Sequence, residues 1–312
     1  MSWDTRSSIL ETLREAALGL AWSQWAPLGG QVAGEVRAPR AVVDPEALVL
    51  FSCALRGAEP RLWDLAAGLA AVEPSLLSVQ RMRNLAKGYH GRADVALAEF
   101  ARIAVREGKD GRWSPLATKG EVNSFRPGKV HAPVDGAVER AGLMLRMRLA
   151  FGVTARTDAL AYLLAISPER ASVAEIARAT GYRTMPLRRG LEAMAAAQVV
   201  QASSTRPARY YAALDRWGPL LDVSKGAAPW RFWQPLMVFL VEAIEALRAD
   251  TAPPRSEYLW SSELRTLVEA HWPALEQNRI NAPDPRHYLG AKYLDGFEET
   301  VKVLRTWLMK NV

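Results

Sequence analysis

The sequence predicts a mainly α-helical protein. Apolar residues recur at helical spacing along most of the 312-residue chain. Several expected helices begin with an acidic residue followed by proline, as at Asp44-Pro45 and Glu59-Pro60, where the missing N–H of proline costs no hydrogen bond. The two-residue period of strands is expected only within residues 199–214.

The N-terminal part of the chain is expected to form a helical domain over residues 1–107. Its predicted helices cover residues 8–25, 45–55, 60–71, 75–88 and 94–106. Residues 108–136 contain many glycines and prolines between basic residues, which predicts a loop or linker. A helix over 138–151 then leads into a central domain over 137–217.

The C-terminal part, residues 218–312, is expected to be helical and rich in aromatic residues. Helices are predicted over 230–247, 261–272 and 288–309, with a loop over 273–285. Bulky aromatics on helices are first of all core residues, but they also suit a dimer interface or an apolar ligand pocket. We therefore expect dimerisation, or binding of a small-molecule or protein effector, in this domain.

The composition describes a globular protein, with 49% hydrophobic and 23% charged residues. A single cysteine, Cys53, excludes an intrachain disulfide and a cysteine-rich metal or iron–sulfur site. The best candidate for a membrane span, the apolar run at residues 236–241, is far shorter than a bilayer requires, and the N-terminus lacks the apolar stretch of a secretory signal. These observations predict a cytoplasmic protein without a membrane partner.

The sequence shows no set of residues that would make an enzyme. Phosphate-binding, dinucleotide-binding and nucleophile-elbow motifs are missing, and the four histidines do not have metal-ligand spacing. Acidic residues are scattered along the chain. We therefore expect a non-enzymatic protein without a metal or another cofactor.

The positive charge is concentrated in the middle of the chain. The net charge is +7, but residues 81–150 carry 14 basic and 7 acidic groups, and residues 151–225 carry 10 and 6. Both ends are slightly acidic. A basic central zone suits a polyanionic partner, with nucleic acid favoured over a membrane because no Lys/Arg-rich amphipathic helix is evident.

Residues 154–198 have the signals of three successive helices. The first runs from Thr154 to Ile166. Ser172 and Glu175 have the spacing of a capping box at the start of the second, which ends at Gly181, where a left-handed residue is wanted. Thr184 is expected to cap the third helix, which ends at Gln198. Pro186 lies in its first turn, where proline is tolerated.

A hairpin is predicted after these helices. Residues 199–203 and 208–214 are expected to be strands joined by a polar turn over 204–207. Helix, short helix, tight turn, helix and hairpin together make the plan of a winged helix-turn-helix, with the hairpin as its wing.

This segment resembles the bacterial winged helix-turn-helix transcriptional regulators, in the broad class that includes the ArsR and MarR families. The resemblance covers about residues 154–213 only. It is carried by residues 172–181, by Leu187 and Leu191, and by the Val199-Val200 strand, with Ala177 as the small residue at the helix crossing. The resemblance implies a DNA-binding transcriptional regulator that acts as a homodimer on double-stranded DNA.

The resemblance also implies which residues contact DNA, because the third helix of such a motif enters the major groove. Arginine can read guanine through two hydrogen bonds, and threonine can contact phosphate. Pro186 and Gly190 inside this helix, and Glu192 near phosphate, are departures that count against strong binding. The expected DNA-binding residues are Arg183, Thr184, Arg188 and Arg189 on the helix, and Arg206 and Arg209 on the wing.

Two alternatives stay open. In the first, the protein is an interaction module, antitoxin-like or defence-associated, whose winged helix is only structural. The second concerns the N-terminal helices 45–55, 60–71 and 75–88, which could be a degenerate helix-turn-helix because Gln80, Arg81 and Arg83 occupy polar positions. An ordinary helical bundle with a solvated polar face is the favoured interpretation of these three helices.

Overall fold

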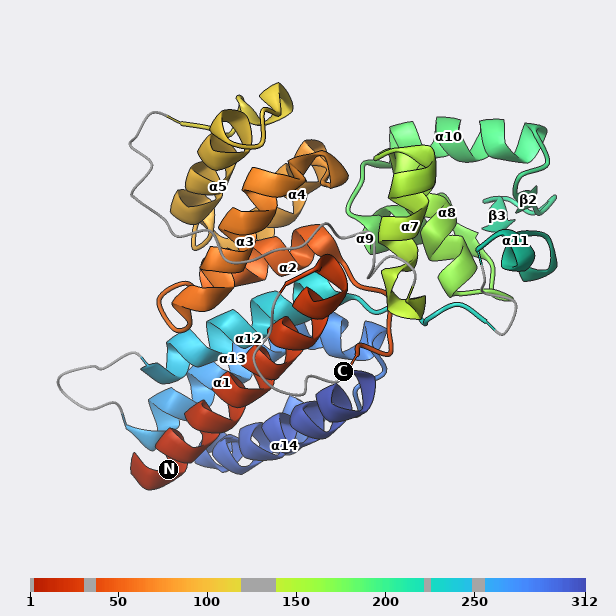
Figure 1. Cartoon of the computed structure of the whole chain (residues 1–312). Helices are drawn as coiled ribbons and strands as arrows, with labels where there is room; N and C mark the ends of the chain where they lie inside the picture. The colour runs from red at the N-terminus through yellow and green to blue at the C-terminus, as the bar shows by residue number, and fades with distance from the viewer. Residues whose placement is uncertain (1–2, 31–37, 119–138, 222–225, 249–255) are drawn as a thin grey trace. The chain divides into compact units, whose positions relative to one another are not determined.

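The computed structural model describes residues 3–30, 38–118, 139–221, 226–248 and 256–312 (Figure 1). Contacts divide the chain into two units: residues 1–22 and 231–312 form unit 1, and residues 23–230 form unit 2. The first helix therefore groups with the C-terminal helices, and not with the N-terminal domain expected over 1–107. The expected central domain shares unit 2 with the other N-terminal helices.

Unit 1 is built from long helices. They are α1 (Trp3–Trp25), whose last residues belong to unit 2, α12 (Trp233–Arg248), α13 (Glu257–Gln277) and α14 (Tyr293–Asn311), with short 3₁₀ turns η6 (Pro285–His287) and η7 (Gly290–Lys292). Helix α13 packs against both α12 and α14. Buried Trp233, Phe239, Leu264 and Phe297 contribute to the core.

Helix α13 is longer than expected, because Pro273 lies inside it and does not end it. The Asn278 side chain supports the last turn: its amide donates to the Ala274 carbonyl over 2.9 Å and to the Phe232 carbonyl over 3.1 Å. The Phe232 N–H donates back to Asn278 Oδ1 over 3.0 Å. The loop predicted over 273–285 therefore begins only after Gln277.

The first half of unit 2 is a helical bundle. Its elements are η1 (Ala26–Leu28), α2 (Pro45–Ala54), α3 (Pro60–Val72), η2 (Pro74–Leu76), α4 (Val79–Ala86), η3 (Lys87–Tyr89), α5 (Asp94–Arg106) and η4 (Gly111–Trp113). The side chains of Asp44 and Glu59 cap α2 and α3 as expected. Trp113 is fully buried against Phe100, with ring centroids 5.0 Å apart.

The second half of unit 2 combines helices with a small sheet. Its elements are η5 (Arg140–Gly142), α7 (Leu143–Phe151), α8 (Ala155–Ala165), β1 (Ala171–Ser172), α9 (Val173–Thr180), α10 (Thr184–Ala196), β2 (Gln201–Ala202), β3 (Arg209–Tyr211) and α11 (Leu214–Leu221). The strands are antiparallel in the order β1-β3-β2, and Tyr210 pairs with both Ala171 and Ala202.

The protein is thus mainly α-helical, as the sequence predicts. Strand β1 was not expected, and the two strands of the hairpin are shorter than predicted. The domain boundary expected near Gly218-Pro219 falls inside α11. Of the linker expected over 108–136, residues 111–113 form η4, and residues 119–136 lie outside the described part of the chain.

Candidate nucleic-acid interface

The helix pair α9–α10 is joined by a tight turn, and local interactions explain its geometry. Ser172 Oγ accepts from the Glu175 N–H over 3.3 Å, and Glu175 Oε2 accepts from the Ser172 N–H over 2.6 Å, which completes the predicted capping box. Gly181 ends α9 with φ +73°, and its N–H donates to the Ala177 carbonyl over 2.9 Å. These interactions fix the two ends of α9.

One face of α10 is buried against the neighbouring helices α8 and α9. Leu187, Gly190 and Leu191 face inward, while Leu163 and Ile176 are fully buried on α8 and α9. This spacing follows the helical period and leaves the opposite face of α10 in solvent.

The four residues predicted on this helix to contact DNA are exposed. Arg183, Thr184, Arg188 and Arg189 lie in the first half of α10 or directly before it. The three arginines make no hydrogen bond or ion pair with any residue that the structure describes. Thr184 is not the cap that the sequence predicts: Arg183 occupies the N-cap position without a side-chain hydrogen bond.

The two departures in α10 have different structural settings. Pro186 is exposed in the first turn of the helix, where its missing N–H would have no intrahelical partner. Gly190 is buried beside α8, and a Cβ atom at this position would lie 2.7 Å from Cγ of Arg156. The absence of a side chain at Gly190 thus lets the aliphatic part of the Arg156 side chain pack closely against α10.

The two arginines predicted on the wing differ in their surroundings. Arg206 is exposed in the turn between β2 and β3 and makes no ion pair with the described residues. Arg209 donates to the Arg170 carbonyl over 2.6 Å and pairs with Glu175 at 3.2 Å. The Arg209 charge is therefore partly neutralised by the capping box of α9, whereas that of Arg206 remains available.

A buried ionic network lies beneath the helix pair. The Arg148 guanidinium on α7 donates to Asp158 Oδ2 over 2.7 Å and to Glu46 Oε1 over 2.8 Å. Tyr182, in the α9–α10 turn, donates its hydroxyl to Asp158 Oδ2 over 2.9 Å. Glu46, Arg148 and Asp158 have no exposed side-chain surface. The network joins α2, α7, α8 and the turn.

Helix α4 extends this network to the turn itself. Arg81 is fully buried: it pairs with Asp44 and Glu46 and donates to the Thr180 carbonyl. Asn84 donates to the Gly181 carbonyl over 3.0 Å. The interpretation of α4 as having a solvated polar face is therefore wrong for Arg81, because this side chain faces the carboxylates and the carbonyl.

The charges of the network determine the protonation of its members. Burial alone would raise the pKa of Glu46, but the charges of Arg148 and Arg81 outweigh it and hold the pKa below its usual value. Burial raises the pKa of the Tyr182 hydroxyl, and the charge of Asp158 raises it further. Glu46 is therefore ionised at neutral pH and Tyr182 is a hydrogen-bond donor.

The network was not predicted from the sequence, although a signal for it exists. Arg148 stands between apolar residues in the helix Leu143–Phe151, and Glu46 opens the apolar helix Pro45–Ala54. A charge in the middle of an apolar run is typical of a buried ion pair. Nothing in the linear spacing indicates which partner each charge meets.

Comparison of the chain with protein-family models, with curated proteins and with solved structures found no match. Among the described residues, no group of three or more His, Cys, Asp or Glu side chains is arranged to hold a metal ion. Within the same residues, each helix is too short or too polar to cross a membrane.

Proposed function

We propose that residues 155–211 form a winged helix-turn-helix and that the protein binds double-stranded DNA with α10 in the major groove. The order α8, β1, α9, α10, β2, β3 supports this proposal, because it contains the helix, short helix, turn, helix and hairpin of that plan. The antiparallel pairing of β3 with β1 attaches the hairpin to the helices.

The observation that carries the proposal is the set of unpaired arginines on α10. Arg183, Arg188 and Arg189 are exposed, without ion-pair partners among the described residues, at the N-terminal half of a helix with a buried opposite face. In a helix-turn-helix this half of the second helix meets the base edges. Guanidinium groups there can bind phosphate or read guanine through two hydrogen bonds.

The wing would add backbone contacts. Arg206 would contact phosphate from the hairpin turn, while Arg209 would contribute less because Glu175 already neutralises part of its charge. Glu192, one turn beyond Arg188, is unfavourable close to phosphate. It is exposed on α10, so it limits the DNA-contacting surface to the first half of the helix.

Fluorescence anisotropy of the full chain tests the proposal. The protein is titrated into labelled DNA from upstream of its own gene and into a scrambled duplex of equal length, across a salt series. Tighter binding to the upstream DNA that persists at about 150 mM salt would establish that the protein recognises a specific DNA sequence. Equal binding to both duplexes, lost steeply with salt, would instead favour the interaction module with a structural winged helix.

A pair of double variants locates the DNA-contacting surface. Arg188→Ala with Arg189→Ala should weaken specific binding by about 1–3 kcal/mol for each base contact that the substitutions remove. Lys292→Ala with Lys310→Ala removes the same charge from unit 1 and is the matched control, because both side chains are exposed and form no ion pair with the described residues. Equal losses of affinity in the two double variants would reject α10 as the recognition helix.

The proposal includes transcriptional regulation by a homodimer. Two copies would present their α10 helices to half-sites about 10 base pairs apart, or a multiple of that spacing. The mass of the protein–DNA complex, measured by light scattering on a palindromic site, gives the number of copies directly. One copy on each site would limit the proposal to a monomeric reader.

A further inference from the structure

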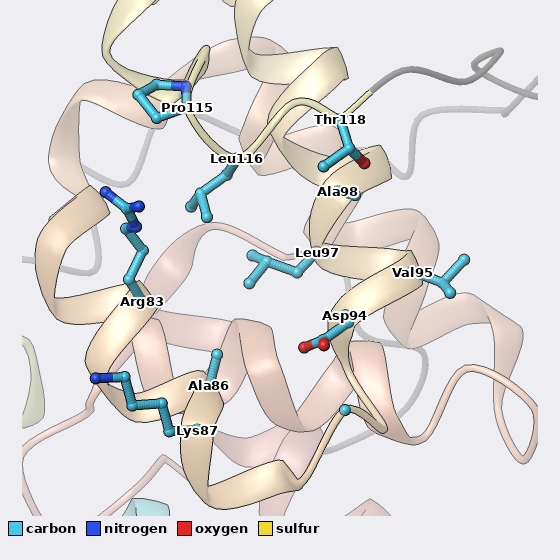
Figure 2. Close-up of a pocket in the computed structure, with 11 residues that line it drawn as sticks. Arg83, Ala86, Lys87, Asp94, Val95, Leu97, Ala98, Pro115, Leu116 and Thr118 are labelled. Carbon is cyan, nitrogen blue, oxygen red and sulfur yellow. The ribbon is translucent and has the colours of Figure 1, made fainter.

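A hollow of about 540 Å³ lies between α4, α5 and the segment that follows η4 (Figure 2). Its size falls in the range of small-molecule sites, which is about 300–1,000 Å³. The hollow belongs entirely to unit 2. It is therefore distinct from the C-terminal region in which the sequence predicts an effector.

The floor of the hollow is apolar. Ala86 on α4 and Leu97 on α5 are buried, and Leu116 lines the hollow from the segment after η4. Figure 2 shows Leu97 and Leu116 pointing toward one another. Such a surface fits a hydrocarbon or aromatic body, whose burial removes apolar area from water.

Two cations lie on one rim of the hollow. Arg83 lines it from α4 and Lys87 from the C-cap of that helix, and their four-residue spacing places them side by side on one face. Like charges at this spacing destabilise a helix. Both side chains are exposed and make no hydrogen bond or ion pair with the described residues, so an anion between them would relieve this repulsion.

Asp94 makes one rim of the hollow acidic, opposite the basic rim. Its carboxylate lies in the first turn of α5, on the opposite rim from Arg83 (Figure 2). An anionic ligand would be repelled from this rim and attracted to α4. A molecule with one anionic end and an apolar body is thus the class that matches all three parts of the lining.

Helix α4 connects this hollow to the α9–α10 turn. Arg83 and Lys87 line the hollow, whereas Arg81 and Asn84 donate hydrogen bonds to the carbonyls of Thr180 and Gly181. We propose that the hollow binds a small amphipathic monoanion and that its occupancy changes DNA affinity through α4. The second half of this proposal rests on the proposed function.

Binding is tested first without DNA. The probe is anilinonaphthalene sulfonate, an aromatic monoanion that fluoresces in apolar sites, and the competitors are octanoate, octylamine and octanol at equal concentrations. Octanoate should displace the probe, and the cationic and neutral competitors should not. Arg83→Gln with Lys87→Gln should weaken the site about tenfold or more, because charge-assisted hydrogen bonds are removed.

The control is the variant Lys292→Gln with Lys310→Gln, which loses the same charge from exposed side chains of unit 1 and should bind the probe as the wild-type chain does. Probe binding that is unchanged in Arg83→Gln/Lys87→Gln, or equal displacement by octylamine, would overturn the site. Both variants change only exposed side chains, so their folding can be compared directly with that of the wild type.

Coupling is then measured as the effect of saturating octanoate on DNA affinity. The wild-type Kd for DNA should shift, and that of Arg83→Gln/Lys87→Gln should not. Octanoate bound in the hollow with an unchanged DNA Kd would overturn the effector role. A chain that binds octanoate but no DNA at all would reject the proposed function and, with it, only the coupled half of this proposal.

Discussion

Unit 2 uses arginine in two opposite ways within neighbouring elements. On α10 and at its N-cap, Arg183, Arg188 and Arg189 stand in solvent without ion pairs among the described residues. Arg81 and Arg148, on α4 and α7, are fully buried and satisfied by carboxylates and carbonyls. The same type of residue therefore joins helices through buried ion pairs in one region and forms a charged surface in the other.

The difference between the two regions lies in the carboxylates around each arginine. Glu46 and Asp158 come from other helices and meet Arg148 in the interior, where an unpaired charge would be very costly. Near Arg188 the acidic residue is Glu192, on the same exposed face of α10. A charged residue in this protein is thus buried in an ion pair or left in solvent according to what tertiary structure places beside it.

The largest expected effect comes from breaking the buried region. Arg148→Met should lower the free energy of unfolding by about 3–5 kcal/mol, because Asp158 would remain buried without its ion-pair partner and Glu46 would keep only Arg81. Urea unfolding followed by circular dichroism measures this change. Arg188→Met, on the exposed region, is the matched control and should change stability by less than about 0.5 kcal/mol. Similar losses of stability in both variants would remove the contrast.

Acid should weaken the buried region in a defined direction. The folded-state pKa of Glu46 lies below its ordinary value of 4.5, so its contribution to stability is complete above pH 4.5 and is lost as the pH falls through the folded-state pKa. As the pH is lowered below 4.5, the urea concentration at the unfolding midpoint should therefore decrease, and it should decrease more steeply for the wild type than for Glu46→Gln. Parallel pH profiles would show that Glu46 does not carry the acid response.

The two glycines of the helix pair should respond differently to alanine. Gly181→Ala should cost about 1–2 kcal/mol, because φ is +73° and the added Cβ would lie 2.7 Å from Leu85 Cδ2. Gly190→Ala should change stability by less than about 1 kcal/mol, since a gain in helix propensity offsets the displacement of Arg156. Thermal unfolding compares the two variants, and a larger loss of stability for Gly190→Ala would contradict the expected order.

The smallest effect concerns the wing. Arg206→Ala should reduce the slope of log Kd against log salt by about 1, the value expected for the loss of one phosphate contact. Arg209→Ala should reduce this slope less, because Glu175 pairs with Arg209. Salt titrations of DNA binding measure both slopes. A larger reduction for Arg209→Ala would mean that the Glu175 pair opens on the DNA.

Much of the local structure follows from the sequence. The capping box of Ser172 and Glu175, the left-handed Gly181 and the caps at Asp44 and Glu59 are short-range interactions that residue spacing specifies. The predicted bounds of α5, Asp94–Arg106, are those of the structure. By contrast Pro273 does not end α13, because Asn278 and the backbone of Phe232 stabilise its last turn from a distance in sequence.

The sequence by itself determined most of the helices, although not α11, together with the order of helix, turn, helix and hairpin and the arginines that follow the turn. Tertiary structure decided that Arg81 and Arg148 are buried, that α4 holds the α9–α10 turn, and that β1 completes the sheet. The physical reason is the separation in sequence between the interacting residues. Caps and turns depend on neighbours within a few residues, whereas the pairing of Arg148 with Glu46 joins residues 102 positions apart and exists only after the helices pack.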